Sequence, residues 1–145
     1  ARPIFLGWAN IERFEQLKRA SERGELIPLA RLLTAAPQDL IASSTEGTLN
    51  YYAQLWSLVM FLREGDDGRH AGELIHAIAD AANGHLQGMA GTEDRPVPDS
   101  RRVFEAYFGD DVAATDERLR EFIQDIVTHG RPELIAQGLS PVLKP

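Results

Sequence analysis

Cysteine is missing from all 145 residues of the chain. Its absence excludes disulfide bonds, zinc sites built on thiolates and a cysteine nucleophile. It leaves the compartment open, because proteins without cysteine occur in both reducing and oxidising surroundings.

Long hydrophobic runs are also missing. The longest apolar block, residues 55–62, is interrupted by Ser57 and is far shorter than the roughly 20 residues that a membrane span requires. We therefore expect no membrane span. The chain starts at Ala1 rather than Met, and its first ten residues are too short and too interrupted for a signal peptide. We expect it to be part of a longer protein.

Positive charge is scarce. The chain has 15 Lys and Arg residues against 22 Asp and Glu residues, a formal net charge of −7. The basic residues are dispersed, whereas a nucleic-acid site needs a continuous positive surface. We therefore expect no nucleic-acid partner. Hydrophobic content of 43% and charged content of 26% are typical of a folded globular protein, and the length suits one domain over residues 1–145.

No complete catalytic or metal motif is present. The four histidines, His70, His76, His85 and His129, never stand in the H-E-x-x-H spacing that zinc peptidases need. Glu73 and His76 have the E-x-x-H spacing used in di-iron bundles, but those bundles need two copies and only one exists here. We interpret this pair as a polar pair on an amphipathic helix, with a di-iron site as the distant alternative.

Acidic residues cluster near the N-terminus of one predicted helix. Asp110, Asp111 and Asp116 have side chains that could bind a cation, but carboxylates near a helix N-terminus are explained by the helix dipole. No serine stands in a G-x-S-x-G setting. From the residues alone we expect no catalytic group, no metal ligand and no cofactor in this chain.

Helical periodicity is what the sequence does contain. Apolar residues recur at helical spacing over residues 9–22, 29–35, 47–64, 69–84, 100–109 and 115–129, with a last turn or two expected over 132–139 and a brief helical piece over 37–43. Residues 88–99 are rich in turn-forming residues and are expected to form a surface loop. No segment alternates like a strand. We predict an all-α fold of about five to seven helices around a central apolar helix at residues 47–64.

The orientation of two helices can also be predicted. The central helix is expected to be surrounded by its neighbours, with an apolar stripe in the core and only a narrow polar strip left. Four more residues, Leu49, Leu58, Met60 and Phe61, widen its apolar surface. The stripe consists of Tyr52, Leu55, Trp56, Val59 and Leu62, and the strip of Asn50, Gln54, Ser57 and Glu64. The helix over 69–84 is expected to pack as the second arm of a hairpin, through Leu74, Ile75, Ile78 and Ala82.

Three segments carry a family resemblance. Residues 52–62, YAQLWSLVMFL, resemble the helix that follows the zinc site in bacterial peptidase MA-like proteins of the gluzincin group, which include a domain family of unknown function. Residues 103–123 resemble the end of that region, and residues 9–35 resemble its beginning. The resemblance implies a C-terminal helical lobe that backs a metallopeptidase cleft. It also implies an N-terminal catalytic-type domain as partner, zinc in the parent protein and an extracytoplasmic location.

In that family the H-E-x-x-H motif and the later zinc-ligand Glu precede the matched region, so the chain alone is expected to be non-catalytic. The resemblance makes Tyr52 and Gln54 the candidate cleft residues, because gluzincins often use a Tyr beyond the zinc ligands to stabilise an oxyanion. The alternative for Tyr52 is a core aromatic whose hydroxyl finds one partner. Its place on the apolar stripe favours the core. The rival function is a helical interaction or scaffolding module without peptidase chemistry.

Overall fold

The computed structural model describes residues 2–34, 38, 45–86 and 100–141, and describes side chains from Asn10 onward. These residues form seven α-helices and one short 3₁₀ helix, and they contain no strand. The helices are α1 (Arg2–Arg23), α2 (Leu29–Thr34), α4 (Thr45–Glu64), η1 (Asp66–Gly68), α5 (Ala71–Ala82), α6 (Ser100–Phe108), α7 (Val112–His129) and α8 (Pro132–Ala136). The all-α prediction is confirmed. The piece expected over 37–43, apart from helical Gln38, and the loop expected over 88–99 lie outside the described residues.

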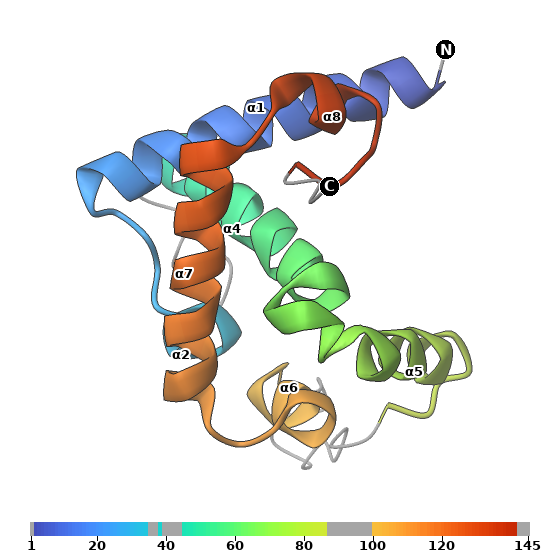
Figure 1. Cartoon of the computed structure of the whole chain (residues 1–145). Helices are drawn as coiled ribbons and strands as arrows, with labels where there is room; N and C mark the ends of the chain where they lie inside the picture. The colour runs from blue at the N-terminus through green and yellow to red at the C-terminus, as the bar shows by residue number, and fades with distance from the viewer. Residues whose placement is uncertain (1, 35–37, 39–44, 87–99, 142–145) are drawn as a thin grey trace.

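The predicted central helix is α4, which contacts α1, η1, α5 and α7. Figure 1 shows α1 lying across one end of the molecule with α8 beside it, and α7 running from that end towards α2 and α6. α1 extends well beyond the predicted start at residue 9. No helix in the described part of the chain is long and apolar enough to cross a membrane.

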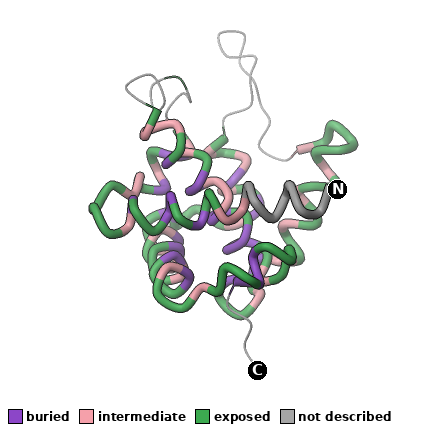
Figure 2. Tube along the Cα trace, turned by 90° about the horizontal axis from the view of Figure 1, so that it is seen from above, coloured by how far each residue is buried: buried purple, intermediate pink, exposed green. Residues whose placement is uncertain are grey.

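The core lies where α1, α4 and α7 meet. Its larger cluster draws on α1, α2, α4, α6 and α7, and includes Leu17, Leu29, Ala53, Phe61, Phe104, Leu119 and Ile123. A smaller cluster of Phe14, Met60, Ile126 and Ile135 joins α1, α4, α7 and α8. Figure 2 shows these buried positions gathered between the helices, with exposed positions on the outside. The predicted core positions of α7 at Leu119, Ile123 and Ile126 are confirmed.

The orientation predicted for α4 is wrong. Three residues of the predicted polar strip, Asn50, Gln54 and Ser57, are buried. Tyr52 and Val59, expected in the core, are 51% and 54% exposed. Leu62 is the member of the predicted stripe that is buried. The interior side of α4 therefore combines polar residues with apolar ones: Asn50, Gln54 and Ser57 lie there beside Ala53, Leu58, Met60, Phe61 and Leu62.

Hydrogen bonds explain this orientation. The Gln54 side chain accepts from Ile27 N at 2.7 Å and donates to Ile27 O at 2.8 Å, so it binds the loop between α1 and α2. Ser57 Oγ donates to Gln54 O of its own helix at 2.8 Å, and Asn50 Oδ1 accepts from Gln16 Nε2 of α1. A buried polar group with a partner costs little, so these three residues do not need solvent.

The packing predicted for α5 is also wrong. No residue of this helix is buried, and Ile75 and Ile78 are 70% and 60% exposed. Leu74 does contact the larger core cluster. The carboxylate of Asp80 also links α5 to α6, because it accepts a hydrogen bond from Tyr107 Oη at 2.6 Å. α5 is thus a peripheral helix with one apolar side turned outward.

The start of α7 differs from the prediction. Asp111 is the N-cap, and its side chain accepts from Ala114 N at 3.0 Å. The predicted cap, Thr115, is buried inside the first turn and donates from Oγ1 to Asp111 O at 3.1 Å. Asp and Thr are both good caps, so the sequence alone did not distinguish them.

Replacing Asp111 with alanine is expected to lower the free energy of unfolding by about 1 kcal/mol, because an N–H at the start of α7 loses its acceptor. Urea unfolding monitored by circular dichroism would measure the change. Asp110→Ala is the matched control, since Asp110 contributes only its backbone carbonyl to this turn. Equal losses for the two variants would contradict the assignment of Asp111 as the cap.

Candidate functional site

A hollow of about 450 Å³ lies between α1 and α4. Leu49 and Tyr52 line it from α4, while its α1 wall consists of Glu12, Arg13, Glu15, Gln16 and Arg19. One wall is therefore apolar, and the other carries charges of both signs. We call this feature the α1/α4 hollow.

Helical periodicity forms both walls. α1 buries Phe14 and Leu17 against the core, and its charged positions fall on the other side of the helix. Leu49 and Tyr52 are one turn apart on α4 and share its outer face. They are 45% and 51% exposed, so a binding partner would meet an apolar surface beside a charged one.

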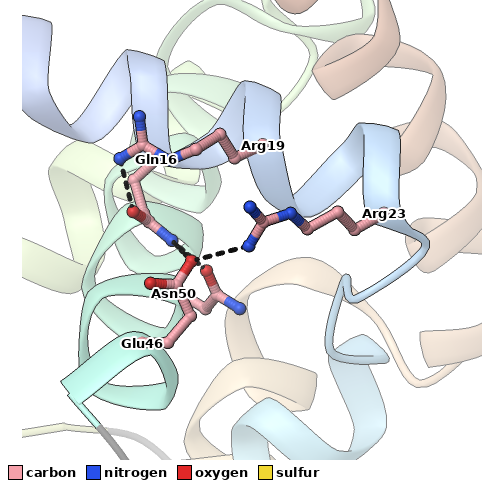
Figure 3. A network of polar contacts seen from close by, with 5 residues as sticks. All are labelled: Gln16, Arg19, Arg23, Glu46 and Asn50. Carbon is pink, nitrogen blue, oxygen red and sulfur yellow. Dashed lines mark hydrogen bonds and ion pairs between the residues drawn. The ribbon is translucent and has the colours of Figure 1, made fainter.

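A polar network fixes α1 against the first turns of α4 beside this hollow (Figure 3). Gln16 Nε2 donates to Asn50 Oδ1 and to Glu46 Oε1, the latter at 2.9 Å, and Gln16 Oε1 accepts from Arg19 Nη2 at 2.7 Å. Arg23 reaches the same Glu46 oxygen at 3.4 Å. Gln16 and Asn50 are buried. The network orients Gln16 and Arg19, which line the hollow, and so holds its α1 wall in place.

Sequence reasoning missed Gln16 and Asn50. A signal for Asn50 was present, because Asn50, Gln54 and Ser57 repeat at i, i+4 and i+7. That spacing describes a helix face as clearly as an apolar stripe does. Its role in packing was missed because unpaired polar residues are costly to bury. The partners of Asn50 and Gln54, which are Gln16 and Ile27, are more than 25 residues away in the sequence.

Tyr52 lies at the α1/α4 hollow and not in the core, which corrects the interpretation favoured by the sequence. Its ring packs edge-on against Tyr51, with the two centroids 5.5 Å apart. Its hydroxyl has no hydrogen-bond partner among the described residues. The phenol is therefore accessible to a ligand or a neighbouring domain.

Gln54 lies elsewhere. Two residues along an α-helix correspond to a rotation of roughly 200°, so Gln54 points to the side of α4 away from Tyr52. Its amide is buried and fully used by Ile27 N and O. The two candidate cleft residues are not brought together. Gln54 has a structural role in the described part of the chain.

Glu73 and His76 are neighbours on exposed α5, with Glu73 Oε2 3.8 Å from His76 Nδ1. His76 Nε2 lies 3.4 Å from Asp80 Oδ2, the same oxygen that accepts from Tyr107. Among the described residues, no group of three or more His, Asp or Glu side chains is placed to hold a metal ion. Two of the acidic residues near the N-terminus of α7 act on helix ends. Asp111 caps α7, and Asp116 Oδ1, within α7, accepts from Leu29 N at the start of α2 at 3.1 Å.

A second hollow, of about 540 Å³, lies where α4 ends and η1 meets α7. Phe61 and Phe122 line it, with ring centroids 5.6 Å apart, beside five carboxylates and Arg118. The carboxylates belong to Glu64, Asp66, Asp67, Glu121 and Asp125. Arg118 Nε lies 3.6 Å from Asp66 Oδ2, and Ser140 Oγ donates to Glu64 Oε1 at 2.8 Å. Neither Tyr52 nor Gln54 lies here.

Comparison with known proteins does not assign the chain to a family. No protein-family profile, curated protein or solved structure matches the chain. The resemblance of residues 52–62, 103–123 and 9–35 to peptidase MA-like proteins therefore stays a hypothesis, and functional inference has to start from the surfaces described above.

Proposed function

We propose that this chain is a non-catalytic helical lobe of a larger zinc-metallopeptidase-like protein, and that the outer face of α4 packs against the domain carrying the zinc site. The proposal joins two supports. One is the resemblance of residues 52–62, which form most of α4. The other is the unexpected outward position of apolar side chains on this same helix.

The outward apolar face carries the proposal. Leu49, Tyr52 and Val59 are 45%, 51% and 54% exposed and share one face of α4. Trp56 lies on this face too and is half-buried against the core. Single exposed apolar residues are ordinary, but a contiguous group of them marks an interaction surface. We call Leu49, Tyr52, Trp56 and Val59 the α4 outer stripe.

Tyr52 is the residue of the stripe with chemistry to contribute. A phenol donates a hydrogen bond to a developing negative charge, and the Tyr52 hydroxyl has no partner among the described residues. In the proposed assembly Tyr52 would lie at the rim of the cleft, with zinc and its ligands supplied by the other domain. Gln54 would stabilise the lobe from inside and would not contact substrate.

Site-directed labelling tests the interface, because a chain without cysteine allows a single thiol to be placed at will. Val59→Cys would report on the stripe, and Glu117→Cys on an exposed position of α7. Each variant would be labelled with a maleimide, first as the isolated chain and then joined to the polypeptide encoded immediately upstream. We expect labelling at position 59 to slow by about tenfold or more in the longer protein, equivalent to roughly 1.4 kcal/mol of protection, and labelling at position 117 to stay unchanged.

The zinc part of the proposal is tested separately. The isolated chain is expected to bind no stoichiometric zinc, whereas the longer protein is expected to bind one zinc ion and to lose peptidase activity when Tyr52 is replaced by phenylalanine. Equal labelling at position 59 in the short and long proteins would refute the interface. A protected stripe without zinc in the longer protein would refute the peptidase assignment alone.

An interaction module without peptidase chemistry is the second candidate. The observation that favours it is the exposed side of α5, where Ile75 and Ile78 are 70% and 60% exposed. Such a surface is unrelated to the resemblance and suits a protein partner. Protection of a thiol placed at Ile78, with no zinc in the longer protein, would support this candidate over the first.

A further inference from the structure

His70 is the one buried histidine among the described residues, and it is incompletely hydrogen-bonded. The residue is only 6% exposed, and its Nε2 atom is buried with no hydrogen-bond partner in the described part of the chain. His70 is also the N-cap residue of α5, and its carbonyl accepts from Leu74 N at 2.9 Å. Burial of an ionisable group at a helix junction calls for an explanation.

The surroundings of the imidazole disfavour a positive charge. Phe61 of α4 and Phe108 of α6 face it with ring centroids 5.6 and 6.0 Å away. The nearby charged groups are Asp66, Arg69 and Arg118. Asp66 Oδ2 is already approached by Arg118 Nε at 3.6 Å and Arg69 Nη1 at 3.7 Å. One carboxylate shared by two guanidinium groups cannot also neutralise an imidazolium.

Burial lowers the pKa of His70 below its ordinary value of 6.5, the positive charges of Arg69 and Arg118 lower it further, and Asp66 partly opposes them. This lowered pKa makes the attachment of α5 depend on pH. When α5 is detached the imidazole regains its ordinary pKa, so the open form binds more protons than the closed form below about pH 6.5. Acidification through that range therefore favours opening.

The attachment of α5 is weak enough for one charge to matter. α5 buries no residue of its own, and its named polar tie to α6 is the hydrogen bond from Tyr107 Oη to Asp80. The turn that joins it to α4 contains Asp66 and Asp67, both in the left-handed region with φ of 52° and 57°. Left-handed non-glycine residues are strained by about 1 kcal/mol or more each, so release of this turn is not opposed by local backbone preference.

We propose that protonation of His70 controls the attachment of α5, and we call this device the His70 latch. When His70 is neutral, its imidazole packs against Phe61 of α4 and Phe108 of α6 and holds α5 in place. When His70 is protonated, α5 is released while the rest of the core stays folded. The orphaned, buried imidazole at the junction of three helices carries the inference. Release would expose Phe61 and Phe108 to a partner. This inference does not depend on the proposed peptidase assembly.

Amide hydrogen exchange of the intact chain tests the latch. Exchange of α5 amides, corrected for intrinsic chemistry, would be compared with that of α7 amides from about pH 7.5 to about pH 5.5, a range in which carboxylates with ordinary pKa values stay ionised. A group returning to a pKa of 6.5 limits the effect to about tenfold over this range. We expect α5 to open several-fold more often at the lower pH and α7 to change little.

Variants of His70 and of an exposed histidine distinguish the effect of His70 from a general loss of stability in acid. His70→Phe and His70→Leu remove the titrating group and keep an apolar side chain, and both are expected to abolish the pH effect on α5. His129→Gln changes an exposed histidine of α7, away from α5, and is expected to leave it intact. NMR titration of the unmodified protein should place the pKa of His70 below its ordinary value of 6.5. An ordinary pKa for His70, parallel opening of α5 and α7, or a pH effect that survives in both His70 variants would overturn the proposal.

Discussion

Replacing Gln54 with leucine is expected to lower the free energy of unfolding by about 3 kcal/mol, because two hydrogen bonds to the backbone of Ile27 are lost together. Leucine has a similar size, so the loss measures unpaired polar groups and not a cavity. Each buried donor or acceptor left without a partner costs roughly 1–3 kcal/mol. Urea unfolding at neutral pH, monitored by circular dichroism, would give the value.

Gln124→Leu is the matched control for this prediction. Gln124 is exposed on α7, and its hydrogen bonds to Thr128 and Ser21 are solvent-exposed. Its replacement is expected to change the free energy of unfolding by less than about 0.5 kcal/mol. If Gln54→Leu were as mild as this control, the buried amide would not be what orients α4.

Replacing Gly130 with alanine is expected to lower the free energy of unfolding by about 2–3 kcal/mol. The cause is overlap of the added Cβ with neighbouring atoms, not the backbone conformation. The backbone of Gly130 is extended, with φ −62° and ψ 140°, which any residue can adopt. A Cβ at this position would overlap the carbonyl oxygen of Ile126 and lie 2.7 Å from the Phe14 ring. Moving either group disturbs the end of α7 or the smaller core cluster, and such overpacking is costly.

Gly72→Ala is the opposite case and serves as its control. A Cβ on Gly72 would meet no atom within 4 Å, and Gly72 lies within α5. Alanine there is expected to stabilise the protein by about 0.5–1 kcal/mol, because it restricts the unfolded chain and favours the helix. Thermal unfolding of the two variants side by side would show shifts of opposite sign. A neutral Gly130→Ala would mean that α8 and α1 adjust freely around this residue.

The helices themselves were largely predictable. The apolar spacing on α7 located three buried positions correctly, because this helix packs one regular stripe against the core. The same rule failed on α4 and α5. On α4 the buried face contains Asn50, Gln54 and Ser57, whose partners come from α1 and from the loop at Ile27. On α5 a regular apolar stripe stays exposed. Periodicity reports which residues share a face, but not what covers that face.

The candidate site was predictable only in part. Tyr52 was named from the resemblance and does line the α1/α4 hollow, though the apolar stripe had favoured a core position. Gln54 was named for the same reason and is buried on the other side of α4. His70 was noticed only as a histidine outside the zinc spacing. Its burial depends on Phe61 and Phe108, which lie 9 and 38 residues away in the sequence.

The sequence by itself determined the all-α class, the existence of a long helix near residues 47–64 and the lack of thiol chemistry, because these follow from local periodicity and composition. Only the tertiary structure decided which side of that helix faces inward. Local patterns assign polar residues to solvent, since desolvation without a partner is unfavourable. A partner more than 25 residues away, such as Gln16 for Asn50 or Ile27 for Gln54, reverses that preference and becomes visible only when the chain is folded.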